Sequence, residues 1–130
     1  MLIDKKIILR CQKYLRVVNQ DDIICCKSED CYTQFYLLTG ESPLISKPLA
    51  QFCKELDPNV FIRVSQSYLV NCNYIKIVDK KNKEIEMLDK SSIKFNVPIK
   101  TLIALIEKGI LYLCFGLINL QYTFNMCALC

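Results

Sequence analysis

The sequence predicts a mainly β (α+β) domain, in which short antiparallel strands are combined with one short helix in the middle of the chain and one helix near its C-terminus. Three observations predict this class. Short runs of β-branched and aromatic residues recur along the chain, polar or glycine-containing turns separate them, and only two stretches show the apolar spacing of a helix. With 130 residues and 52% hydrophobic content, the chain can bury one core and is too apolar to be disordered.

The strands are expected in pairs that are close in sequence. The first pair flanks the polar Gln12 and Lys13, which predicts a hairpin, and Gly40 ends the second pair. The third pair flanks a charged turn at residues 79–83 and is followed by one more strand. The expected ranges are 7–11 with 14–18, 23–27 with 32–38, and 74–78 with 84–88 and then 93–97. This short spacing indicates a mostly antiparallel arrangement.

The first helix is expected to begin near Pro48, whose fixed φ suits a first turn, and to end at Asp57 and Pro58. Its apolar positions recur at i, i+3, i+4 and i+7, the spacing of a helix that faces a core. They are Leu49, Phe52, Cys53 and Leu56.

The second helix is expected over residues 98–108, with Gly109 as a natural C-terminal stop. Its apolar stripe consists of Ile99, Leu102, Ile103 and Ile106. We therefore divide the chain into a domain at residues 1–109 and an uncharged apolar tail at residues 110–130, whose role the sequence leaves open.

The nine cysteines do not predict a disulfide framework, because their number is odd, Cys25 and Cys26 are adjacent, and no secretory signal precedes them. Buried thiols in a reducing cytoplasm fit better, with Cys25 and Cys26 on opposite faces of a strand, one in the core and one at the surface. The pair Cys127 and Cys130 has no second pair and no histidine to complete a zinc site, so no metal or cofactor is expected.

The charge and the missing residue types limit the possible functions. A net charge of +4 is compatible with a polyanionic partner, although it is lower than in strongly basic nucleic-acid binders. The chain has no histidine for a Ser-His or Cys-His pair and only three glycines, with no phosphate-binding loop among them. We therefore expect no enzymatic activity.

The most specific stretch is residues 61–71, which read FIRVSQSYLVN and are followed by Ile75. This stretch resembles the central pattern of the LytTR family, F-[IFY]-R-[VC]-[HN]-[RKN]-S-[YF]-[LIV]-V-N. Shorter segments resemble the family in the same order: DDII at 21–24, CYT at 31–33, LTG at 38–40, KPL at 47–49 and SSI at 91–93. The resemblance extends from Tyr14 to about Lys108. It implies a LytTR-type fold and a bacterial, response regulator-like transcription factor that binds double-stranded DNA.

In this family, loops at one edge of the sheet enter the major groove in place of a recognition helix. The positions of this chain that correspond to the family's DNA-binding loops are Tyr32, Thr33, Ser65, Gln66, Ser67 and Lys100. A glutamine amide can donate and accept at once, as bidentate contact with adenine requires. Strand alternation predicts that Arg63 turns away from DNA, toward a carboxylate such as Glu55 or Asp57.

The third loop departs from the family, which commonly has V-S-R-R where this chain has VPIK at residues 97–100. Lys100 is the remaining basic residue. Lysine neutralises a phosphate as a point charge but lacks the planar fork with which arginine reads guanine. We therefore expect Lys100 to contact the DNA backbone.

The remaining expectations concern partners. A second copy on tandem half-sites is typical of the family, and no receiver domain precedes the motif. Residues 110–130 have the length of a bilayer span, but contain Asn119, Gln121 and Asn125. A membrane anchor, an interface with a protein partner and a gene-end artefact remain open for this tail. The expected location is cytoplasmic, with or without membrane tethering, and the alternative function is an interaction or membrane-associated module that has lost specific DNA binding.

Overall fold

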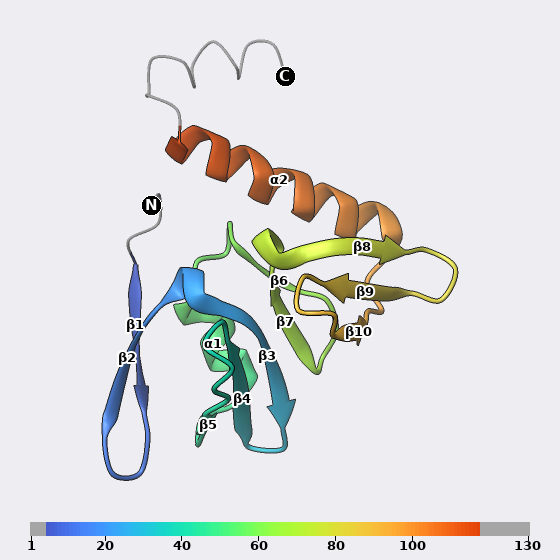
Figure 1. Ribbon diagram of the computed structural model, residues 1–130. Coiled ribbons are helices and arrows are strands. Elements are labelled where there is room, and N and C mark those ends of the chain that lie inside the picture. Colours follow the sequence, from blue (N-terminus) through green and yellow to red (C-terminus); the bar gives the residue numbers. More distant parts are fainter. Residues whose placement is uncertain (1–4, 118–130) are drawn as a thin grey trace.

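The strands form three antiparallel sheets (Figure 1). The computed structural model describes residues 5–117, and the side chains up to Leu111. A five-stranded sheet has the order β5-β4-β3-β7-β6, a three-stranded sheet has the order β10-β9-β8, and β1 and β2 form a separate hairpin. The strands are β1 (Lys6–Arg10), β2 (Leu15–Asn19), β3 (Ile23–Glu29), β4 (Tyr32–Leu37), β5 (Leu44–Ile45), β6 (Phe61–Arg63), β7 (Tyr68–Asn71), β8 (Ile75–Asp79), β9 (Glu84–Met87) and β10 (Ser92–Lys94), and the helices are α1 (Leu49–Glu55) and α2 (Ile99–Leu117).

The five-stranded sheet is covered on both faces, which produces two separate cores. Phe35 and Leu69 face one core together with the β1–β2 hairpin and α1. Val70 faces the other core together with the three-stranded sheet and α2. Cys25 and Cys26 do lie on opposite faces, but both are buried, one in each core. The expectation of one surface thiol was wrong, because neither face of β3 is open to solvent at this point.

The hairpin and α1 pack side by side on the first core. Alternate hairpin residues Ile7, Leu9 and Val18 are buried, as the period of two requires of a sheet with one covered face. Phe52 of α1 packs edge-on against Phe35, with ring centroids 4.8 Å apart. The predicted hairpin and the predicted first helix are both confirmed, with Pro48 as the N-cap of α1.

The predicted end of the second helix was wrong. The helix α2 continues through Gly109 to Leu117. Gly109 is buried instead, and a Cβ atom there would lie 3.0 Å from the carbonyl oxygen of Asn59 and would collide with Sγ of Cys72. Glycine is present here because α2 approaches the η2 turn (Cys72–Tyr74) closely, and not because the helix stops.

The other predicted strands are present with small shifts in their ends, and β10 stops at Lys94 instead of residue 97. The strands β5, β6 and β7 were not among the predicted ranges, and β5 has only two residues, which are too few to show a period. Neither of the helices in the part of the chain described has both the length and the apolar character needed to cross a bilayer. The tail expected at residues 110–130 lies outside the described residues from 118 onward.

Candidate nucleic-acid interface

Two of the three loops predicted to contact DNA lie at the same end of the five-stranded sheet. The β3–β4 turn follows Glu29, and the β6–β7 loop precedes Tyr68. Because β7 pairs with β3 in the register Lys27 to Tyr68, the loop and the turn leave the sheet next to each other. A hydrogen bond from the Ser28 N–H to the Ser67 carbonyl oxygen, 2.8 Å long, continues this ladder into the loop.

The β6–β7 loop is held from both sides by hydrogen bonds. Arg63 donates from Nε to the Ser65 carbonyl oxygen and from Nη2 to the Gln66 carbonyl oxygen, both at 2.8 Å. Oγ of Ser65 accepts from the N–H groups of Ser67 and Tyr68 at 3.2 Å. With its backbone fixed in this way, the loop presents the exposed side chains of Gln66 and Ser67 to solvent.

Arg63 therefore has a different partner from the one predicted. The expected carboxylates are engaged elsewhere: Glu55 pairs with Lys47 at 2.6 Å and Asp57 with Lys5 at 3.4 Å. Arg63 also donates to Sγ of Cys53 at 3.2 Å. Strand alternation alone could not predict that Arg63 holds the β6–β7 loop. The guanidinium can donate to the carbonyl oxygens of that loop only because the loop bends back over it.

The β3–β4 turn places its two predicted residues in opposite environments. Tyr32 is 45% exposed, so its hydroxyl is available to a ligand. Thr33 is fully buried, and its hydroxyl donates to the Lys47 carbonyl oxygen at 2.7 Å. The Thr33 side chain does not reach the surface in this arrangement, because Thr33 is the next residue along the strand from Tyr32 and therefore faces the core.

The third loop is joined to the second by one backbone hydrogen bond. The Asn96 N–H donates to the Val64 carbonyl oxygen at 3.0 Å, which holds the segment before α2 beside the end of β6. Lys100 lies exposed in the first turn of α2, a turn that contains no acidic residue. The free N–H groups of a helix N-terminus also favour an anion, so the local charge here suits a phosphate.

The charges at the β3–β4 turn are mixed. Glu29 forms an ion pair with Lys27 at 3.3 Å, and the hydrogen bond to Glu29 is the main cause of the raised pKa of Lys27. Asp30 is exposed at the turn, with a left-handed φ of 56°. The negative charge of Asp30 makes the turn less favourable for a phosphate group, whereas the exposed Tyr32 can form a hydrogen bond through its hydroxyl.

A family model for the LytTr DNA-binding domain matches residues 13–104. A solved structure resembles the chain with a TM-score of 0.64 and 17% sequence identity, covering 78% of this chain and 94% of the other. That structure is the LytTr DNA-binding domain of a Bacillus cereus protein described as a methyl-accepting/DNA response regulator. No curated protein matches the chain. The family model covers well over half of the sequence, and the solved structure independently has the same fold. The chain therefore belongs to the LytTr DNA-binding domain family.

Proposed function

We propose that this protein binds double-stranded DNA in a sequence-specific manner and regulates transcription in the bacterial cytoplasm. Membership of a DNA-binding domain family supports the binding itself. One structural observation carries the proposal of base reading: Gln66 is exposed on a loop whose backbone is held by Arg63 and Ser65. A fixed backbone limits the positions that the Gln66 amide can reach. An amide held in this way can select one base, whereas attraction to phosphate is the same for every sequence.

Each exposed residue has a different role in this proposal. Gln66 enters the major groove and forms paired hydrogen bonds with one base, most naturally adenine. Tyr32 and Ser67 flank it with hydroxyl groups that reach bases or phosphate oxygens. Lys100 contacts the DNA backbone from the first turn of α2. Ser65 acts indirectly, because its hydroxyl oxygen already accepts two backbone hydrogen bonds within the loop.

Selection from a pool of random duplexes by the full-length protein, repeated across a salt series, tests this function. The full chain is required because a fragment ending at Gly109 would cut α2. Enrichment of a short motif supports sequence-specific binding. Gln66→Ala should then relax the preference at one position by roughly 1–3 kcal/mol, while Lys100→Ala should weaken all duplexes alike and reduce the salt slope by about 0.9. Binding that is equal for all sequences would contradict the proposal.

A second candidate function is an interaction module that kept the fold without specific DNA binding. The observation in its favour is the outer face of the β1–β2 hairpin, where Ile8, Leu15 and Val17 are exposed. Three neighbouring apolar side chains on one open face suit a protein or membrane partner. If the random pool shows no enrichment, this face becomes the first surface to test by substituting Val17→Asp.

A further inference from the structure

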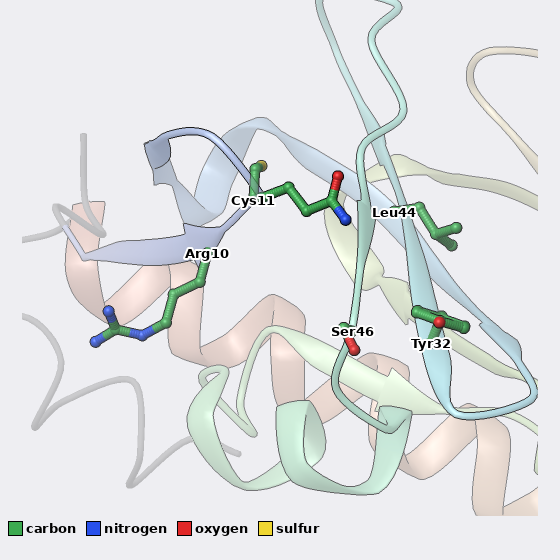
Figure 2. A pocket seen from close by; sticks show the side chains of 6 residues that line it. Arg10, Cys11, Tyr32, Leu44 and Ser46 are labelled. Carbon is green, nitrogen blue, oxygen red and sulfur yellow. The ribbon is translucent and has the colours of Figure 1, made fainter.

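The tip of the β1–β2 hairpin and the sheet edge beside it enclose an open cleft of about 610 Å³ (Figure 2). The cleft is lined by Arg10, Cys11, Gln12, Tyr32, Leu44 and Ser46. The lining brings together an amide and two hydroxyl groups from three separate segments of the chain, and none of the described residues that line it carries a carboxylate. Such a set of donors suits an anion or a string of oxygen acceptors better than a cation or an apolar ligand.

The hairpin next to the cleft carries only positive charge. Between residues 5 and 19 there are five basic residues and no acidic residue: Lys5, Lys6, Arg10, Lys13 and Arg16. Lys13 and Arg10 are exposed at the tip. In Figure 2 the Arg10 side chain extends away from Tyr32, so its guanidinium widens the positive surface beside the cleft and does not fill it. The local surface therefore favours a polyanion that passes across the tip.

The hairpin is fixed against the rest of the domain. Arg16 binds both carboxylate oxygens of Glu41, at 2.7 and 3.1 Å, and Lys5 pairs with the buried Asp57. The Asp57 N–H in turn donates to Oε1 of Gln20, directly after the hairpin, at 3.0 Å. With its inner face in the core and these polar ties at both ends, the tip is held in place before any ligand binds.

The cleft is continuous with the surface proposed to read DNA. Tyr32 belongs to both, since it starts β4 after the β3–β4 turn and also lines the cleft. In Figure 1 the hairpin tip and the β3–β4 turn lie at the same end of the molecule. A DNA duplex that contacts Tyr32 and Gln66 would therefore extend toward the tip on the side away from Lys100. Arg10, Cys11 and Gln12 lie outside residues 13–104, which the family model matches, so family membership does not imply a contact by these three residues.

We propose that the hairpin tip is a second DNA-contacting element, and that the cleft beside Tyr32 receives a stretch of sugar–phosphate backbone flanking the bases read by Gln66. This inference rests on the proposed function. The hydroxyl groups of Tyr32 and Ser46 and the amide of Gln12 donate to phosphate oxygens, Leu44 lies against a sugar, and Lys13 and Arg10 neutralise adjacent phosphates. The hairpin tip adds affinity without adding base preference, because Arg10, Gln12 and Lys13 contact only the sugar–phosphate backbone.

The salt dependence of DNA binding tests the charged part of the inference. Arg10→Gln and Lys13→Gln should each reduce the slope of log affinity against log salt by about 0.9, and the double variant by about twice that. The preferred sequence should stay the same. Lys54→Gln is the matched control, since it removes one exposed positive charge from α1, away from the tip. Slopes equal to that of the Lys54→Gln control would overturn the inference.

Thiol alkylation tests occupancy of the cleft directly and separates the two proposals. Cys31 lies exposed in the β3–β4 turn and Cys11 lines the cleft, and both are free thiols. Full-length protein is treated briefly with N-ethylmaleimide, with and without an enriched duplex, and each peptide is quantified by mass spectrometry. Protection of both thiols supports the inference. Protection of Cys31 alone overturns it while leaving the proposed function intact, and protection of neither contradicts both.

Discussion

The N–H group of Ser28 donates to the carbonyl oxygen of Ser67 at 2.8 Å, one residue beyond the last pair of the β3–β7 ladder. The bond joins the strand that leads into the β3–β4 turn to the loop that carries Gln66. The two loops are therefore parts of one hydrogen-bonded unit, in which a backbone bond joins the loops and the side chains of Arg63 and Ser65 hold the shape of the loop that carries Gln66.

Arg63 should control selectivity without touching DNA. Arg63→Lys keeps the charge, but a single ammonium group cannot replace the guanidinium that donates to two carbonyl oxygens at once. The loop therefore loses the hydrogen bonds that hold its backbone. We expect about tenfold lower discrimination between the preferred duplex and a single-base variant, roughly 1.4 kcal/mol, with a smaller change in binding to unrelated DNA. Competition titrations measure both. A variant that loses affinity equally for all duplexes would show that Arg63 contacts phosphate instead.

Thr33 should contribute to stability and not to DNA binding. Thr33→Val preserves the shape of the buried side chain but removes the donor to the Lys47 carbonyl oxygen. A buried acceptor left without its donor costs about 1–3 kcal/mol, which urea denaturation can measure. Affinity for DNA, measured well below the unfolding midpoint, should stay within about twofold of the unmodified protein. A large loss of affinity in the folded variant would return Thr33 to the set of contact residues.

Asp30 should weaken DNA binding in the natural sequence. Asp30→Asn removes the exposed charge at the β3–β4 turn while keeping a residue that tolerates the left-handed φ of 56°. We expect roughly threefold tighter binding at low salt, and a smaller gain as salt screens the repulsion. Asp89→Asn is a useful comparison, since it removes a charge from the turn after β9, next to the three-stranded sheet. An equal gain in both variants would indicate a general effect of net charge.

Gly109 should be intolerant of even one added methyl group. A Cβ atom there would collide with Sγ of Cys72 and lie 3.0 Å from the Asn59 carbonyl oxygen, so α2 would have to shift. Gly109→Ala should destabilise the protein by about 1–3 kcal/mol, although alanine has the higher helix propensity. Removing Sγ with Cys72→Ala should recover part of this loss in a double-mutant cycle. Thr101→Ala, at an exposed position of α2, serves as the control and should be nearly neutral.

Alkaline pH should destabilise the fold through its buried thiols. Burial raises the pKa of Cys25 from its ordinary value of 9.0 to about 12, and raises the pKa of Cys26 as well. A raised pKa in the folded state means that this contribution is fully present below pH 9 and is lost as the pH rises toward 12. The free energy of unfolding should therefore fall over this window. The fall should be shallower in Cys25→Ala than in the unmodified protein, and identical slopes would contradict the assignment.

The sequence predicted those parts of the fold that depend on local pattern. The β1–β2 hairpin, the strands β3, β4, β8 and β9 and the helix α1 follow from alternation, from turn residues and from the spacing of Leu49 and Phe52. The differences at Gly109, Arg63 and Thr33 have separate causes. Gly109 depends on η2, a distant part of the chain that packs against α2. Arg63 donates to the carbonyl oxygens of Ser65 and Gln66, which are close in sequence but come within reach only because the loop folds back. Thr33 follows Tyr32 on β4, so strand alternation turns its side chain into the core.

In the candidate site, too, the sequence predicts the local motif but not the contacts between distant segments. The motif identified Gln66 and Ser67, and the structure places both at the surface. The ladder that brings their loop to the β3–β4 turn joins Lys27 to Tyr68, which are far apart in the sequence. The cleft beside Tyr32 also lies between segments that are distant in the sequence, since it is formed by the hairpin tip and β5. The sequence indicates this cleft only through the basic stretch at residues 5–19, and charge alone does not show where that stretch lies in the fold.

The surface proposed to read DNA lies at strand ends and in the loops between them, while the two cores consist of strand and helix interiors. Gln66, Ser67 and Tyr32 can thus be exchanged with little loss of packing, whereas Arg63 and Ser65 must be kept to hold the loop in shape. This separation makes the domain a practical scaffold for engineering. A combinatorial library limited to the three exchangeable positions would keep the fold constant and could be screened for variants that recognise a chosen promoter.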